Sequence, residues 1–133
     1  DAGMTLYTVG SIKRIPGYKQ YAAVDGGMTD NPRYALYQSR YTVYHGSKTG
    51  PTERFDVVGR CCESGDIIQP HVELPADTCR GDILAVCTTG AYNYSMASNY
   101  NRLPRPPIVM LTPEGSYTAV RRETFADLTA LDE

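Results

Sequence analysis

The chain has 133 residues with 13 basic and 15 acidic side chains, a formal net charge of −2. This length suits one domain with one core, and the balanced charge, with no Lys/Arg-rich run, argues against nucleic acid as a partner. No apolar run could span a bilayer and no leader peptide is present, so no membrane partner is expected. Because the first residue is Asp1 and not Met, we expect a piece cut from a longer protein.

Short runs of β-branched and aromatic residues, separated by turn residues, predict many short strands. Pro16-Gly17 makes the turn of a first hairpin, and Gly26-Gly27 ends its second strand. The elements predicted before the last third of the chain are strands at 5–15 and 19–25, a short helical piece at 31–37, and strands at 41–45, 53–59, 67–69 and 82–88, with a loop from Leu74 to Asp82.

The last third of the chain has less periodicity. Residues 90–101 predict an irregular or briefly helical loop, and the strands 108–111 and 117–121 flank Pro-Glu-Gly-Ser in a closing hairpin. Thr124-x-x-Asp127 resembles a capping box for a short final helix, with Phe125, Leu128 and Leu131 on one face. The fold class expected is all-β with a short C-terminal helix, an antiparallel Greek-key sandwich or partly closed barrel.

The four cysteines do not form the pattern of a disulfide framework or a zinc site. Cys61 and Cys62 are adjacent, which is far from ordinary disulfide geometry, and neither Cys79 nor Cys87 completes a C-x-x-C pair. Reduced thiols in a cytoplasmic protein are the simpler interpretation. The composition of 11 Tyr and no Trp is typical of a surface that meets a ligand or a partner.

The segment VDGGMTDNPRYALY (24–37) holds a first candidate site. Arg33 and Tyr37 are four residues apart, so on a helical turn they would lie side by side. A guanidinium beside a phenol can bind and orient a carboxylate. The alternative is an ordinary turn with a solvated arginine.

The segment CCESGD (61–66) holds a second. If the strand continues through it, Cys61 and Cys62 point to opposite faces, one toward a site and one toward the core. The carboxylate of Glu63 disfavours ionisation of the neighbouring thiol, which suits a neutral thiol that donates a proton. The alternative is two cysteines that fill small gaps in the core.

A third candidate is the segment 88–101, which holds three tyrosines and three asparagines beyond a buried-looking strand. Loops at strand ends commonly carry binding groups, and Gly90 would allow a sharp turn. The alternative is a polar surface loop. His45 and His71 are each isolated from acids and nucleophiles, so both are interpreted as structural or surface residues.

Three segments occur in a specific order: VDGGMTDNPRYALY, VVGRCCESGD and GDILAVCTTGAYNYSMASNYN. With the opening TLYTVGSIKRIPG and the closing LPRPPIVML, they resemble over nearly the whole chain the C-terminal β domain of the pyridoxal 5′-phosphate (PLP)-dependent ornithine, diaminopimelate and arginine decarboxylases, and the diaminopimelate branch in particular. C-E-S-G-D and G-A-Y-x-x-S-M-A-S-x-Y-N are the strongest motifs.

This resemblance implies a larger enzyme. Its members join an N-terminal (β/α)8 barrel, which carries PLP on a lysine as a Schiff base, to a sheet domain of this kind. They are homodimers, and the sheet domain of one subunit completes the site of the other. The implied reaction converts meso-2,6-diaminopimelate to L-lysine and CO2, with the cofactor as electron sink.

The resemblance also implies roles for single residues. Cys62 matches the cysteine that protonates the carbanion after CO2 leaves. Glu63, Arg33 and Tyr37 match residues that contact the distal end of the substrate, and Tyr92, in G-A-Y, matches the tyrosine that touches the cofactor near its phosphate and lines the substrate site. Cys61 has no matching role and is interpreted as packing.

One departure from the family limits what this chain does alone. The glycine-rich phosphate loop, the E-P-G-R segment and the cofactor lysine are absent, and Lys13, Lys19 and Lys48 lie in other contexts. We therefore expect residues 1–133 to be the C-terminal domain only, inactive by itself. The alternatives are the same domain of an ornithine, arginine or carboxynorspermidine decarboxylase, or a non-catalytic ligand-binding β module.

Overall fold

The computed structural model describes residues 2–133, and most of its regular structure is β-strand. In chain order the elements are β1 (Met4–Ile15), β2 (Lys19–Val24), α1 (Arg33–Tyr37), β3 (Val43–His45), β4 (Thr52–Val58), β5 (Ile67–Pro75), β6 (Ile83–Cys87), α2 (Asn93–Met96), η1 (Tyr100–Arg102), β7 (Ile108–Thr112), β8 (Gly115–Val120) and α3 (Phe125–Leu128).

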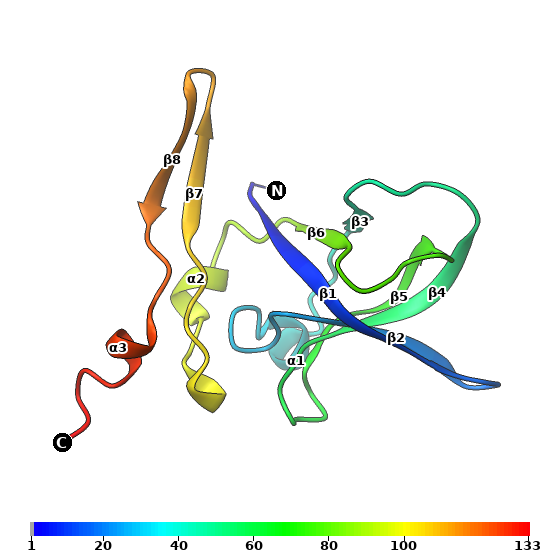
Figure 1. Ribbon diagram of the computed structural model, residues 1–133, viewed down its shortest axis with the longest axis horizontal. Coiled ribbons are helices and arrows are strands. Elements are labelled where there is room, and N and C mark those ends of the chain that lie inside the picture. Colours follow the sequence, from blue (N-terminus) through cyan, green and yellow to red (C-terminus); the bar gives the residue numbers. More distant parts are fainter. Residues whose placement is uncertain (1) are drawn as a thin grey trace.

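Six strands form one strongly curved sheet in the order β3-β6-β1-β2-β4-β5 (Figure 1). The long strand β1 pairs with β6 through its first half and with β2 through its second half. The two end strands, β3 and β5, come back beside each other, and the backbone N–H of Tyr41 donates to Oε1 of Gln69 at 2.7 Å across the gap. The sheet is therefore nearly closed, which confirms the predicted barrel-like fold class.

One strand pair departs from the expected antiparallel pattern. β2 and β4 are parallel, with Ala22 opposite Val57, while the other pairs are antiparallel. Parallel neighbours need a long crossover, and residues 25–51, which include α1 and β3, provide it. The first candidate site, Arg33 and Tyr37, lies on α1 within this crossover.

Alternating apolar residues fill the inside of the barrel. In β6, Leu84 and Val86 are fully buried, whereas their neighbours point outward, as the period of two requires. The other strands contribute in the same way, and the buried core residues are Tyr7, Val9, Ala22, Val24, Val43, Phe55, Val57, Ile68, Val72, Leu74, Leu84 and Val86.

Strand β5 is longer than predicted. The sequence predicts a strand over residues 67–69 only, and Pro70, which follows, has no N–H to donate to a ladder. In the structure a bulge accommodates the proline: Val57 lies opposite Gln69 and Phe55 opposite Val72. His71 takes a positive φ of 58° there, and its N–H donates to Oδ1 of Asp56 at 2.9 Å and not to a strand neighbour.

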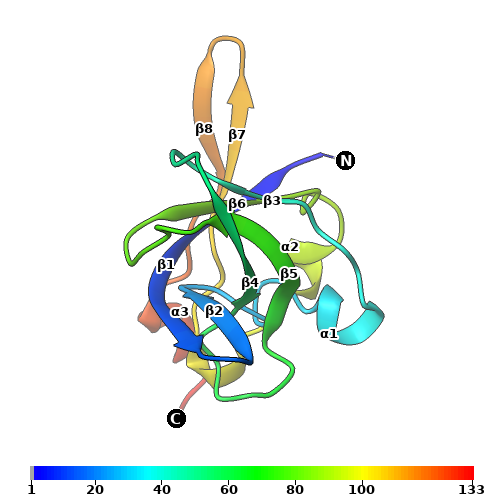
Figure 2. The same cartoon turned by 90° about the vertical axis from the view of Figure 1, so that its right-hand side faces the viewer.

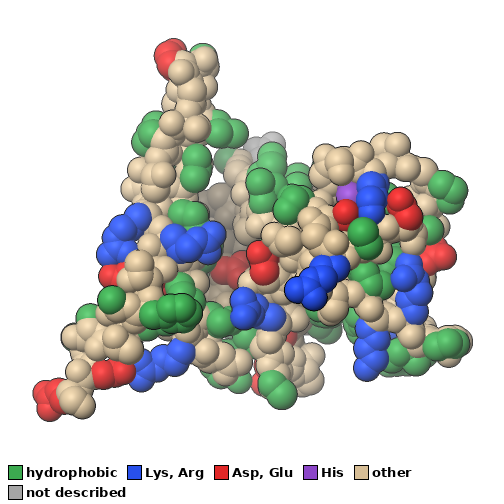
Figure 3. Space-filling model, in the orientation of Figure 1, with side chains coloured by type: hydrophobic (Ala, Val, Ile, Leu, Met, Phe, Trp, Pro, Cys, Tyr) green, Lys and Arg blue, Asp and Glu red, His purple; other side chains and the backbone are tan. Residues whose placement is uncertain are grey.

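The C-terminal part stands outside the barrel. β7 and β8 form the predicted closing hairpin as a separate two-stranded sheet, and both views show it projecting beyond the barrel (Figures 1 and 2). Hydrophobic side chains lie along this hairpin on the surface (Figure 3), including Leu111, which is 80% exposed. The capping box of α3 is confirmed, because Thr124 and Asp127 exchange backbone and side-chain hydrogen bonds.

The apolar face expected on the last helix is open to solvent. Phe125 is exposed and Leu128 half-buried, and because α3 ends at Leu128, the almost fully exposed Leu131 lies beyond the helix and does not share its face. No helix in residues 2–133 has both the length and the apolar character needed to cross a membrane.

Candidate functional site

Three segments far apart in sequence meet at one edge of the barrel: α1, the loop 59–66 that follows β4, and the start of α2. The guanidinium carbon of Arg33 lies 4.8 Å from the ring centre of Tyr92, which joins α1 to α2. A methyl group on Gly65 would lie 3.9 Å from that of Ala35, which places the loop 59–66 against α1. Each predicted site therefore lies beside at least one other.

Arg33 lies between two aromatic rings. Its guanidinium carbon is 5.4 Å from the ring centre of Tyr37, as the spacing of four predicted, and 4.8 Å from that of Tyr92, which the sequence did not predict. Nη1 also faces Sδ of Met96 at 3.9 Å, a weak acceptor. Within residues 2–133 no carboxylate lies within 4.0 Å of this half-buried cation. The two rings hold the guanidinium by cation–π attraction and leave its N–H groups free for an anion.

The adjacent cysteines lie on a bend and not on a strand. β4 ends at Val58, because the N–H of Gly59 turns to the carbonyl oxygen of Asp66 at 2.9 Å and closes a loop. The expected alternation of strand faces is therefore wrong as a reason for the exposure of these thiols. Cys62 is nonetheless exposed and Cys61 half-buried, and burial, with the nearby carboxylate of Asp66, raises the pKa of the Cys61 thiol.

Glu63 follows Cys62 on the same exposed bend. Its Oε1 accepts hydrogen bonds from the N–H of Gly65 at 3.0 Å and from Oγ of Ser64 at 3.2 Å. Oε2 has no hydrogen-bond partner within residues 2–133. The turn therefore holds the carboxylate in place while one of its oxygens stays available to a cation.

Tyr92 opens α2 in an unusual backbone conformation. Its φ is 71°, a region that non-glycine residues seldom adopt, and its ring is 65% exposed. Strained residues of this kind concentrate at functional sites. Gly90 serves a different purpose from the turn expected of it: a Cβ there would come within 3.0 Å of the carbonyl oxygen of Ala2, so a glycine is needed for close approach.

Asp66 is the residue that the sequence reasoning undervalued. It is 4% exposed, and its carboxylate accepts hydrogen bonds from the N–H of Met28 and from the N–H of Cys61, each at 2.6 Å. The sequence does contain a signal, because Asp66 precedes Ile68 by two residues, the spacing that places side chains on one face of an extended strand, and Ile68 is fully buried.

The two histidines were expected to be isolated from acids, but the structure places each ring within 4.0 Å of an aspartate, Asp82 for His45 and Asp56 for His71. The ring of His45 is 3% exposed, with Nδ1 accepting from the N–H of Lys48 at 2.9 Å and Nε2 lying 3.1 Å from Oδ2 of Asp82. His71 has its ring mostly in solvent. Within residues 2–133 no three His, Cys, Asp or Glu side chains gather in a way that could hold a metal ion.

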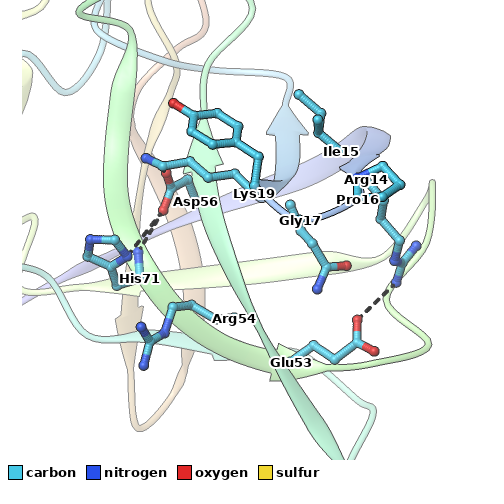
Figure 4. A pocket seen from close by; sticks show the side chains of 11 residues that line it. Arg14, Ile15, Pro16, Gly17, Lys19, Glu53, Arg54, Asp56 and His71 are labelled. Atoms are coloured by element: carbon cyan, nitrogen blue, oxygen red, sulfur yellow. Dashed lines mark hydrogen bonds and ion pairs between the residues drawn. The ribbon is translucent and has the colours of Figure 1, made fainter.

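A depression lies elsewhere on the molecule, under the β1–β2 turn (Figure 4). It has a volume of about 730 Å³ and is lined by none of the predicted site residues. Its charges are paired within the chain: Nζ of Lys19 lies 2.7 Å from Oδ2 of Asp56, and Nη2 of Arg14 lies 3.7 Å from Oε2 of Glu53. Because these charged groups already have partners within the chain, few of them are available to bind a charged ligand.

The lysines do not suit covalent attachment of a cofactor, because an imine forms only from a neutral amine. Hydrogen bonds from Lys19 to Asp56 and from Lys48 to Asp82 raise the pKa of both amines. Lys13 lies on β1 opposite Tyr21, in the hairpin and outside the three site segments. Of the groups that could meet PLP, the chain offers the exposed phenol of Tyr92, which fits a contact with a cofactor held by another domain.

Comparison with known proteins agrees with this description. Residues 1–90 match the model of the pyridoxal-dependent decarboxylase C-terminal sheet domain. Over 99% of its length the chain is 50% identical to diaminopimelate decarboxylase of Bacillus subtilis, of which it covers 30%.

Solved structures give the same result. Diaminopimelate decarboxylase of M. jannaschii with L-lysine superposes with a TM-score of 0.92 at 35% identity, over 98% of this chain and 30% of that one. The enzyme of Helicobacter pylori with L-lysine gives 0.89 at 31% identity, over 97% and 31%. This chain spans about a third of the length of these relatives, and it belongs to the C-terminal sheet domain family of the pyridoxal-dependent decarboxylases.

Proposed function

We propose that residues 1–133 are the C-terminal domain of a diaminopimelate decarboxylase, whose N-terminal (β/α)8 barrel lies outside this chain. The observation that carries the proposal is the 50% identity to such an enzyme over nearly the entire chain. The full-length enzyme converts meso-2,6-diaminopimelate to L-lysine and CO2. PLP, when bound by the barrel, supplies the electron sink for the bond that breaks.

Cys62 donates the proton that replaces CO2. Its thiol is exposed on a bend at the edge of the barrel, where it can reach into a site on another polypeptide. The S–H proton passes to the carbon that has lost CO2, and the sulfur regains a proton from solvent before the next turnover. A positioned thiol can serve as a general acid of this kind.

Arg33 and Glu63 recognise the far end of the substrate. Diaminopimelate ends in a second amino-acid group, which carries one carboxylate and one ammonium. The unpaired guanidinium of Arg33 binds the carboxylate, and Tyr37 and Tyr92 hold the guanidinium in place. The free oxygen of Glu63 accepts from the ammonium. Tyr92 also contacts the cofactor near its phosphate.

The active unit is a homodimer in which this domain completes the site of the partner subunit. Alone, the chain has an acid, two charged groups and a phenol at its surface, but Lys19 and Lys48 are each paired with a carboxylate that raises the pKa of the amine. The isolated chain is therefore inactive and does not hold PLP covalently. Four unpaired cysteines support a reducing compartment, the cytoplasm.

A decarboxylase of ornithine, arginine or carboxynorspermidine is the second candidate. Ornithine and arginine lack the distal carboxylate, so either would leave Arg33 without an anionic partner. Full-length enzyme assayed with each substrate separates the two. We expect CO2 release from diaminopimelate and little from ornithine; turnover of ornithine alone would favour the second candidate, and ligand binding without turnover a non-catalytic module.

Sharing of the site between subunits has its own test. Full-length Cys62→Ala and a variant lacking the barrel lysine are each expected to be inactive, with the Cys62→Ala enzyme retaining the absorbance spectrum of bound cofactor. Co-expressed, they form heterodimers with one intact site, so activity returns. Cys79→Ala, which removes another exposed thiol, serves as the control and stays active. Recovery in no mixture would mean that each site is built from one subunit.

A further inference from the structure

Asp66 carries a buried charge that no cation neutralises. It is 4% exposed, and within residues 2–133 no Lys, Arg or His lies within 4.0 Å of its carboxylate. Burying a carboxylate is costly unless hydrogen bonds satisfy it. Here two backbone N–H groups do so, Met28 on Oδ1 and Cys61 on Oδ2, both at 2.6 Å.

These two donors belong to different loops. Met28 follows the Gly26-Gly27 pair after β2, and Cys61 is the residue directly before Cys62. A further backbone bond, from the N–H of Arg60 to the carbonyl oxygen of Gly26 at 3.1 Å, runs between the same loops. The carboxylate of Asp66 therefore clamps the cysteine bend to the segment that leads into α1.

Two glycines make room for this clamp. A Cβ on Gly27 or on Gly59 would come closer than 3.0 Å to a carboxylate oxygen of Asp66. Gly27 also has a φ of +156°, whereas Gly59 has no such conformation, so its need for glycine comes from the carboxylate alone. Gly27 and Gly59 therefore both leave space for the buried carboxylate of Asp66.

A second carboxylate extends the clamp to the core. Oδ1 of Asp30 accepts from the N–H of Gly27 at 2.8 Å, and Oδ2 accepts from the hydroxyl of Tyr7 in β1. Burial raises the pKa of Asp30, and the nearby charge of Asp66 adds to this rise. Asp30 precedes Arg33 by one short turn, so the clamp fixes the start of α1 together with the cysteine bend.

We propose that Asp66 is a positioning residue that sets the place of the Cys62 thiol relative to the Arg33 guanidinium. The inference rests on the proposed function, because it matters for turnover only if both side chains meet one substrate. Asparagine at position 66 has a single carbonyl oxygen, which can accept from only one of the two N–H donors. Its NH2 group would face the remaining donor and could not accept from it. One of the two loops is then released.

The test compares Asp66→Asn with Asp56→Asn in the full-length enzyme loaded with PLP. Asp56 is equally buried but lines the depression of Figure 4 and accepts hydrogen bonds from Lys19 and His71, which lie outside the three site segments. In Asp66→Asn we expect amide hydrogen exchange in peptides covering residues 59–64 to quicken by about tenfold to a hundredfold, the range for losing one charge-assisted hydrogen bond. Exchange there is unchanged in Asp56→Asn.

Catalysis supplies the second readout. A misplaced thiol slows proton delivery, so kcat falls by about tenfold or more and the solvent deuterium isotope effect on kcat rises, while the spectrum of bound cofactor stays unchanged. A merely less stable protein would lower the amount of active enzyme without changing that isotope effect. Asp56→Asn keeps both values.

Gly59→Ala tests the clamp from its other side. The added methyl group pushes on the Asp66 carboxylate, whereas the control Gly10→Ala adds the same group 3.6 Å from the nearest backbone oxygen. Gly59→Ala is expected to show the exchange and isotope effects of Asp66→Asn, and Gly10→Ala neither.

Quickened exchange with unchanged kcat and isotope effect would overturn the inference and leave the proposed function standing. Unchanged exchange in both Asp66→Asn and Gly59→Ala would overturn it too. If the wild-type enzyme does not turn over diaminopimelate, the proposed function fails, whereas the exchange data still decide whether Asp66 clamps the loops.

Discussion

Two buried aspartates with the same exposure, Asp56 and Asp66, mark two different regions of the molecule. Asp56 sits under the depression of Figure 4 and is neutralised by Lys19 at 2.7 Å. Asp66 sits beneath the cysteine bend and is held by backbone N–H groups only. In the first region the buried carboxylate is paired with a lysine of the same chain. In the second, the buried carboxylate bonds to backbone N–H groups and so holds a loop in place.

Two arginines repeat this contrast. Arg14 lies over Phe55, with its guanidinium carbon 5.5 Å from the ring centre, and bonds to the carbonyl oxygen of Ala76 at 2.8 Å and faces Glu53 at 3.7 Å. Arg33 has two rings but no carboxylate. The depression of Figure 4 is thus less suitable for a charged ligand than the surface around Arg33, because an unpaired charged group creates the need for a partner.

The largest difference between the regions is expected in catalysis. In the full-length enzyme, Arg33→Met should lower kcat/KM for diaminopimelate on the order of a hundredfold, because a buried charge pair with the substrate is lost. Arg14→Met removes a guanidinium that also lies over an aromatic ring and should leave kcat/KM unchanged. Steady-state kinetics of both variants measure this, and comparable losses in the two would break the comparison.

The next difference is in stability. Asp56→Asn should lower the free energy of unfolding by about 1–3 kcal/mol, because it weakens the hydrogen bonds from Lys19 and from the N–H of His71. Asp77→Asn changes a carboxylate that is 73% exposed and should stay within about 0.5 kcal/mol of the wild type. Urea unfolding monitored by circular dichroism gives both values. A larger loss in Asp77→Asn would contradict this interpretation of the depression.

The smallest expected effect is on the pH dependence of the free energy of unfolding, which should have opposite signs for a carboxylate in each region. Burial by itself would raise the pKa of Asp56, but the hydrogen bonds from Lys19 and His71 lower it below the ordinary 3.8. Its contribution to stability is therefore present above pH 3.8 and is lost as the pH falls through the folded value. Burial raises the pKa of Asp30 above 3.8, so in the window above 3.8 its contribution grows as the pH falls.

Unfolding free energies of the wild type, Asp56→Asn and Asp30→Asn between pH 3 and 6 check this prediction. The differences from the wild type should change with pH in opposite directions, by up to about 1.4 kcal/mol for each unit of pKa shift. Parallel slopes would mean that the two carboxylates share one kind of environment, and the comparison between the regions would then fail.

Local patterns predicted local structure well. The first hairpin, the helical piece ending at Tyr37 and the capping box at Thr124 depend on residues within a few positions of one another, and each was confirmed. The length of β5 was underestimated, because the bulge that accommodates Pro70 depends on an acceptor, Asp56, on the neighbouring strand.

The sequence by itself determined the fold class, the pairing of Arg33 with Tyr37 and the family motifs, since turn chemistry and residue spacing are written along the chain. Only the tertiary structure decided that Tyr92 covers the second face of Arg33, that the cysteines lie on a bend, and that Asp66 joins their loop to the one before α1. Such contacts bring together residues tens of positions apart, and only the closing of the barrel places them within hydrogen-bonding reach.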